Sequence, residues 1–226
     1  MGFLNMKIRF LVVLMTIVLI QKSSIGQYGF HLEAGAVLFS IPSGNQQYLI
    51  KNTSHFGIGP SYWFRIKPRR IEFNPALIFD YTKSNELSNA LSLKEIQFKL
   101  SVPILFYPMD FGNDCNCPTF NKQGQFFKKG FHFILNPNIA YNKQTYKTVT
   151  DPVANSALLF SIGIGAGIDI GINRAWTFSP SFVLSKSFND EFLLKDSGLI
   201  EKDLSLSRYQ ANLLLRFLWY PRKKRY

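Results

Sequence analysis

The segment LLFSIGIGAGIDIGI, residues 158–172, alternates without a break between two kinds of residue. One set is apolar throughout and comprises Leu158, Phe160, Ile162, Ile164, Ala166, Ile168, Ile170 and Ile172. The other set is mostly glycine, with one serine, one aspartate and, at its start, Leu159. Because successive side chains of a strand point to opposite faces, such a strand has one hydrocarbon face and one small, polar face. Its length suits a tilted membrane-spanning strand, which needs roughly 9 to 11 residues.

The N-terminus carries the pattern of a secretory signal peptide. Lys7 and Arg9 precede an apolar run over residues 10–20, and small residues follow at Ser24 and Gly26. We predict cleavage before Gln27, so that residues 1–26 leave the mature protein. A retained N-terminal anchor is the alternative, but the run is shorter than the roughly 18 apolar residues that a spanning helix needs. The rest of the chain has no apolar run of that length, so it either stays soluble or crosses a membrane as a closed sheet.

Alternating segments recur along the whole mature chain. We count eight, at residues 28–39, 55–66, 71–81, 96–107, 131–141, 158–172, 176–185 and 209–220. An even number of antiparallel strands is typical of small outer-membrane barrels. The sequence therefore predicts an all-β fold, a transmembrane antiparallel up-and-down β-barrel of 8 strands over residues 27–220. At this strand number the interior is filled by side chains.

Connection lengths predict an orientation with both termini in the periplasm. Residues 67–70 and 173–175 form tight turns on that side, and residues 41–51, 83–90, 142–155 and 187–207 are the expected external loops. Residues 108–130 are an exception, a long connector on the periplasmic side, which is either a specialised element or an overlooked hairpin. Aromatic side chains fall near the strand ends on the same side, as amphipathic rings do at a membrane interface. They are Phe30, Phe64, Phe106, Phe131, Trp176, Phe217 and Trp219.

Charged residues on the inward positions form a predicted structural network in the lumen. Its members are Glu33, Arg65, Glu72, Lys99, Asp169 and Arg216, with Asp80 also on an inward position. Arg65 and Glu72 lie symmetrically about a turn, and Glu33 and Arg216 lie on strands that must meet to close the barrel. Buried charges need partners. We expect a salt-bridged plug; a proton or ion relay is the alternative.

Signatures of an enzyme are weak. His31, His55 and His132 all take inward positions, but His55 is expected near the outside and the other two near the periplasm. No G-x-S-x-G nucleophile signature accompanies them. We therefore expect a protein that is not an enzyme and that uses no cofactor. A small lipid-modifying enzyme is the least favoured alternative.

Two further features lie outside the alternating segments. Cys115 and Cys117 are too few for a zinc site, and in an oxidising periplasm they could be a local disulfide, free thiols or an intermolecular bridge. The tail at residues 221–226 contains Arg222, Lys223, Lys224 and Arg225, which form either a solvated end or a docking site. The whole chain carries a net charge of +12. In the envelope this charge favours lipid phosphates, anionic glycans or an acidic protein as partners, and no nucleic acid.

The segments IEFNPALIF at 71–79 and IQFKLSVPILFY at 96–107 resemble the central strand pair of the PorT-like outer-membrane β-barrel family of Bacteroidota. Gly163, Gly165 and Gly167, and the final LLLRF at 213–217, are also similar to it. The resemblance implies a barrel in the outer membrane and an accessory role in type IX secretion or gliding. This chain departs from the family pattern by continuing through residues 221–226 after the aromatic residues of its last strand, so recognition by the barrel-assembly machinery would depend on Phe217, Trp219 and Tyr220.

We thus expect a structural or accessory partner in the cell envelope of a Gram-negative, Bacteroidota-like cell. Its expected contacts are outer-membrane lipid, the barrel-assembly machinery and an envelope secretion complex. A small-solute channel is the alternative function.

Overall fold

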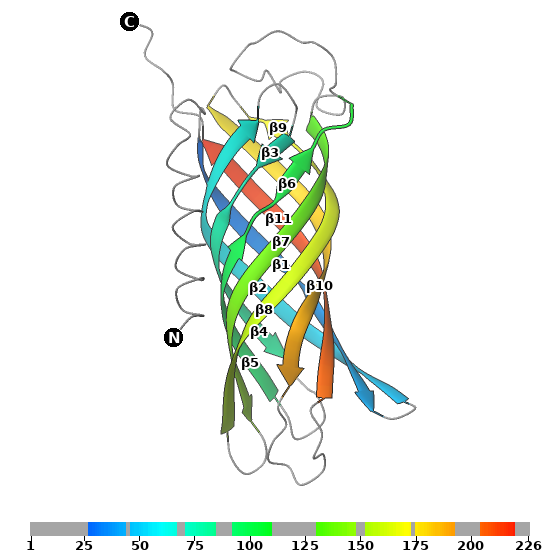
Figure 1. Cartoon of the computed structure of the whole chain (residues 1–226). Helices are drawn as coiled ribbons and strands as arrows, with labels where there is room; N and C mark the ends of the chain where they lie inside the picture. The colour runs from blue at the N-terminus through cyan, green and yellow to red at the C-terminus, as the bar shows by residue number, and fades with distance from the viewer. Residues whose placement is uncertain are drawn as a thin grey trace, which may run out of the picture.

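The computed structural model of this protein describes residues 27–43, 46–66, 71–84, 92–109, 130–147, 152–172, 175–192 and 204–219. These residues form eleven strand segments that wrap into one barrel (Figure 1). The segments are β1 (Gln27–Ser43), β2 (Gln46–Ile66), β3 (Ile71–Phe73), β4 (Ala76–Ser84), β5 (Ser92–Ser101), β6 (Ile104–Phe106), β7 (Phe131–Lys147), β8 (Pro152–Ile168), β9 (Ile170–Gly171), β10 (Trp176–Phe192) and β11 (Leu204–Trp219). No helix in these ranges is long and apolar enough to cross a membrane.

The sheet closes on itself. Its antiparallel order is β1-β11-β10-β8-β7-β5-β4-β2, and β2 pairs again with β1. The first and last strands run side by side from Tyr28 opposite Trp219 to Ser40 opposite Ser207. Tyr28 and Trp219 therefore lie at the same end of the barrel, which we call the proximal end. Ser40 and Ser207 lie toward the opposite end, which we call the distal end.

Eleven segments make only eight strands because three strands are interrupted. Asn74 and Pro75 separate β3 from β4, Val102 and Pro103 separate β5 from β6, and Asp169 separates β8 from β9. Proline has no backbone N–H and breaks the regular ladder. Pairing nevertheless continues across the gaps, since the Asn74 amide donates to the Pro103 carbonyl at 2.9 Å. The predicted eight-stranded antiparallel barrel is confirmed.

The two faces of the wall are chemically opposite. Large apolar side chains face outward and are exposed, with Leu77 at 63%, Phe98 at 63% and Ile164 at 66%. Charged and polar side chains face inward and are buried, as Glu33 and Asp169 are. In water this arrangement would be unfavourable in free energy, because apolar side chains would contact water while polar groups would be buried. It is the arrangement of a transmembrane barrel, in which the closed sheet satisfies its own backbone and lipid solvates the outside.

Aromatic rings gather at the proximal end, as the sequence predicts. Trp176 and Trp219 are register partners with ring centroids 6.4 Å apart. Phe64 stacks on Phe73 at 5.2 Å, and Phe178 lies 5.0 Å from Phe217. Rings at this position fit the aromatic girdle that such barrels place at a membrane interface.

The expected bounds of the external loops are wrong, because the strands run much further than the apolar alternation does. Strand structure occupies 41–43 and 46–51, 83–84, 142–147 and 152–155, and 187–192 and 204–207. A ladder needs only backbone groups, so pairing continues beyond the part of the wall that has an apolar face. The predicted signal peptide at 1–26, residues 110–129 of the connector with Cys115 and Cys117, and the tail at 221–226 lie outside the described residues.

Candidate functional site: the charged lumen

The lumen holds a dense set of buried ionisable groups. The structure describes the side chains of five acidic residues, and all five are buried there: Glu33, Glu72, Asp80, Glu95 and Asp169. Three buried cations and three buried histidines accompany them: Lys99, Arg208, Arg216, His31, His55 and His132. Arg65 is half-buried. These groups fall into successive layers along the barrel axis.

The distal layer is an ion pair across the barrel. Arg208 Nη1 on β11 donates to Glu95 Oε1 on β5 at 2.6 Å, and both side chains are fully buried. β11 and β5 are four places apart in a ring of eight, so they lie on opposite walls. The Gln97 amide donates to the same carboxylate oxygen. The pair therefore joins opposite walls of the barrel.

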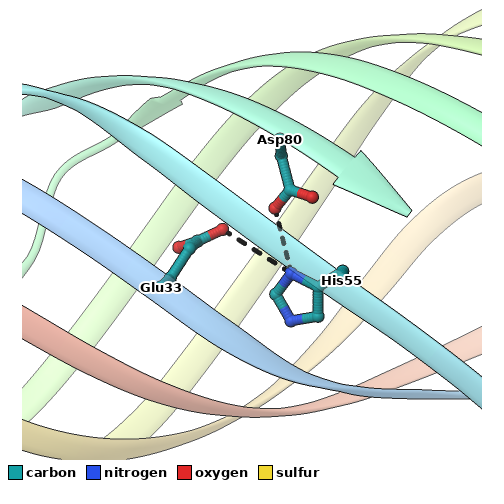
Figure 2. Close-up of side chains that lie close together, drawn as sticks. All are labelled: Glu33, His55 and Asp80. Carbon is teal, nitrogen blue, oxygen red and sulfur yellow. Dashed lines mark hydrogen bonds and ion pairs between the residues drawn. The ribbon is translucent and has the colours of Figure 1, made fainter. Parts of the chain in front are cut away.

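The middle layer brings together Glu33, His55 and Asp80 from three different strands (Figure 2). His55 Nδ1 lies 3.1 Å from Asp80 Oδ2 and 3.9 Å from Glu33 Oε1. Lys99 Nζ on β5 donates to Glu33 Oε1 on β1, three places around the ring, and to Asp80 Oδ2 at 3.2 Å. On its other side, His55 Nε2 lies 2.8 Å from Asn212 Oδ1.

The middle layer also has the composition of a metal site. Ligand atoms of Glu33, His55 and Asp80 all lie within 4.8 Å of one another. Nitrogen and carboxylate oxygen are suitable ligands for a divalent cation such as Zn²⁺. The ammonium of Lys99, however, already lies against both carboxylates. Lys99 is thus the cation of this cluster, and the geometry is that of a structural ion-pair network.

The proximal layer is centred on Arg216. Its Nη2 donates to His132 Nε2 at 2.9 Å and to Ser179 Oγ at 2.6 Å. His132 belongs to β7, three places around the ring from β11, so this contact also crosses the lumen. His132 Nδ1 lies 2.9 Å from the Gly130 carbonyl, which can only accept. Nδ1 therefore carries the proton, and Nε2 accepts from Arg216.

Ser181, His132 and Asp169 resemble a nucleophile triad in this layer. Ser181 Oγ is 3.5 Å from His132 Nε2, and His132 Nδ1 is 3.7 Å from Asp169 Oδ1. A triad needs a free Nε2 to take the serine proton. Here Nε2 accepts a hydrogen bond from Arg216, and all three side chains are buried. The arrangement leaves Ser181 without a base.

At the proximal end two aromatic side chains lie within hydrogen-bond distance of carboxylates. The Tyr107 hydroxyl lies 2.6 Å from Asp169 Oδ2 and 2.8 Å from Glu72 Oε2. Trp63 Nε1 donates to the same Glu72 oxygen at 2.8 Å. Two acidic groups from separate strands are thereby held by one phenol and one indole.

Two inward glycines make room for these groups. A Cβ at Gly57 would lie 2.7 Å from Glu33 Cγ, and a Cβ at Gly167 would lie 2.1 Å from Ser181 Oγ and 2.7 Å from His132 Nε2. Such distances are far below van der Waals contact. Because these two inward glycines have no side chain, polar side chains of neighbouring strands occupy the space beside them.

One predicted pairing of charged residues is confirmed, and another takes a different form in the structure. Arg65 and Glu72 are register partners, as their symmetry about the turn predicts. The strands of Glu33 and Arg216 are neighbours, but the register sets Arg216 opposite His31. Glu33 instead meets Lys99 from across the lumen.

The expected separation of His55 from His31 is wrong. The two histidines flank one carboxylate, since His31 Nε2 is 3.6 Å and His55 Nδ1 is 3.9 Å from Glu33. The reason is that β2 begins at Gln46, nine residues before His55, so His55 lies well inside the barrel. The sequence reasoning also missed Glu95, Tyr107 and Arg208. The strict alternation Glu95-Gln97-Lys99 could have revealed the first of these.

No family model matches this chain, and no curated protein matches it. Solved structures with a similar arrangement include Neisserial surface protein A, at 11% identity and a TM-score of 0.42, covering 84% of this chain and 96% of that one. Ail, the attachment invasion locus protein of Yersinia pestis, has 11% identity and a TM-score of 0.43, over 84% and 98% of the two chains. The N-terminal β-barrel domain of Pseudomonas aeruginosa OprF has 14% identity and a TM-score of 0.36, over 86% and 99%. At these values the likeness concerns the barrel architecture alone.

Proposed function

We propose that this protein is a small outer-membrane β-barrel whose lumen is closed by its own side chains, and that it acts as a structural or accessory component of the cell envelope. The observation that carries this proposal is the set of contacts across the lumen. Arg208 with Glu95, Lys99 with Glu33, and Arg216 with His132 join distant walls at successive levels. A hydrated ion would have to break each of them in turn.

Burial of the inward side chains supports the same function. Arg208 and Arg216 are both 0% exposed, although they point into the centre of the barrel. Side chains that line a water-filled pore would be accessible to water. Eight strands enclose only enough space for side chains. A small-solute channel is therefore the less favoured function.

The remaining parts of the proposal concern orientation, partners and chemistry. The start of the first strand and the end of the last strand both lie at the proximal end, which suits periplasmic termini in a Gram-negative outer membrane. The sequence resemblance to PorT-like barrels of Bacteroidota favours an accessory role in type IX secretion or gliding as the specific form. The hydrogen bond from Arg216 to His132 disfavours an acyl-transfer enzyme.

Single-channel recording tests the closed lumen. We expect the refolded wild-type barrel to give no stable openings in a planar bilayer. A variant with Lys99→Ala, Arg208→Ala and Arg216→Ala loses the three cross-lumen cations and should conduct, whereas the outward-facing Lys186→Ala control should stay silent. Stable openings of the wild type would contradict the proposal and favour the channel.

Co-purification tests the accessory role. The full chain and a variant lacking residues 108–130 are isolated from gently solubilised outer membrane. We expect a stable partner with the full chain and a weaker association with the variant. The absence of any partner with either chain would count against an accessory role and leave a purely structural one.

A further inference from the structure

The distal part of the outer wall carries a group of lysines at the edge of the apolar surface. On β4, β5 and β7, which are neighbours in the sheet, the outward apolar positions are followed toward the distal end by an exposed lysine. These residues are Lys83, Lys94 and Lys143, which we call the lysine trio. On these three strands the trio marks the level at which the outward face changes from apolar to charged.

The register brings like charges together. Lys83 and Lys94 are direct partners on β4 and β5. Lys143 on β7 pairs with Ile96, two residues along β5 from Lys94, and therefore lies diagonal to Lys94 on the same face. Like charges directly opposite each other in a sheet are destabilising. Such a group is stable when an anion lies between the ammonium groups.

The described part of the chain supplies no anion for the trio. None of the three lysines forms an ion pair with a described residue, and all five acidic side chains that the structure describes are buried in the lumen. The described acidic side chains thus lie inside the barrel, whereas the trio lies on its outer face. Within the described part of the chain the trio has no complementary anion, which favours an anion from the surroundings of the barrel.

The surface next to the trio suits hydrocarbon. Four exposed apolar or aromatic side chains face outward on the same three strands, two or four residues further from the distal end than the lysines. They are Tyr81, Ile96, Phe98 and Tyr141. Tyr81 is the register partner of Ile96, and Phe98 is the partner of Tyr141. They form one continuous apolar patch directly adjoining the three ammonium groups. A ligand that covers both surfaces has an anionic head and apolar chains.

We propose that the lysine trio binds the phosphate groups of anionic lipid in the membrane leaflet at the distal end, with the acyl chains lying on the Tyr81–Ile96–Phe98–Tyr141 patch. This inference rests on the proposed membrane location of the barrel. Basic side chains at a membrane surface attract anionic lipid by about fivefold in binding per lysine. A phosphate between Lys83 and Lys94 relieves their repulsion, and a diffusing phosphate ion gains nothing from the apolar patch.

Lys186 provides a matched control on the same wall. It faces outward on β10, two places around the ring from β7, and its Nζ lies 5.4 Å from the centre of the Tyr209 ring. A cation–π contact stabilises its charge without an anion. Replacing Lys186 by a neutral residue removes one positive charge from the outer wall, as replacing any one lysine of the trio does.

The test uses the refolded full chain and native mass spectrometry after mixing with equal amounts of phosphatidylglycerol and phosphatidylcholine. We expect the wild type to carry several-fold more phosphatidylglycerol. The variant with Lys83→Gln, Lys94→Gln and Lys143→Gln should lose most of this preference, whereas Lys186→Gln should keep it. Equal preference in the wild type and the triple variant overturns the inference.

Two further readouts separate the ways in which the inference could fail. A heat-dependent shift in electrophoretic mobility shows whether each chain folds into lipid vesicles. Failure of the wild type to fold there would contradict the membrane location itself. Inorganic phosphate is added as a competitor. Full displacement of phosphatidylglycerol by millimolar phosphate identifies a plain anion site and overturns the lipid assignment, whereas retention of the lipid supports it.

Discussion

Arg208 and Glu95 form a buried ion pair of 2.6 Å between strands on opposite walls, although 113 positions separate them in the sequence. The pair spans the lumen and should also contribute to the stability of the barrel. Breaking a buried pair by removing one partner costs much more than replacing both, because the remaining charge is left without compensation.

The first prediction concerns this pair. Arg208→Leu alone should lower the free energy of unfolding by about 3–5 kcal/mol. The double variant with Glu95→Leu should recover most of that loss, because it leaves no buried charge behind. Urea unfolding of barrels in lipid vesicles, followed by tryptophan fluorescence, measures both values. Additive losses in the double variant would show that the two residues do not act as a pair.

The second prediction concerns Lys99. Lys99→Ala removes the cation from between Glu33 and Asp80, and the two carboxylates and His55 then resemble an open zinc site. Zn²⁺ should raise the melting temperature of this variant and leave the wild type unchanged. At one hundred times its dissociation constant, a ligand stabilises a fold by about 2.7 kcal/mol.

A variant carrying both Lys99→Ala and His55→Ala is the control for zinc binding, since it lacks the only nitrogen ligand of the cluster. It should respond little to Zn²⁺. An equal response from both variants would place the ion elsewhere in the molecule.

The third prediction uses adjacent positions on β8. Gly167→Val puts methyl groups where Ser181 and His132 already lie, and overpacking of this kind costs about 1–3 kcal/mol. Ala166→Val adds two methyl groups to the outward face and should be tolerated. Thermal unfolding of the two variants provides the comparison. Equal stability would mean that the lumen has spare room beside β8.

The fourth prediction concerns the triad-like group. A fluorophosphonate probe should not label Ser181 in the folded barrel, because His132 Nε2 accepts from Arg216 and the hydroxyl is buried. Intact-mass analysis of the wild type and of Ser181→Ala checks this. Labelling of the wild type that disappears in Ser181→Ala would establish a nucleophile and contradict the closed, non-enzymatic lumen.

The wall of the barrel could be predicted from the chain because its signal is local. Alternation places Phe98 outward and Lys99 inward whatever the neighbouring strand is, and each strand carries this pattern within itself. Strand ends were harder to predict. Beyond the apolar part, backbone pairing continues through residues such as Gln144 and Arg208 without any hydrophobic signal.

The sequence by itself determined a closed, eight-stranded wall with an apolar exterior and a polar interior, because period-two alternation is a property of each strand alone. Only the tertiary structure decided which charges meet inside. Glu33 could have been assigned to Arg216 on the adjoining strand, yet it meets Lys99 from across the lumen. Contacts across a barrel depend on the relative register and stagger of strands that are distant in the chain. That geometry arises only when the sheet closes.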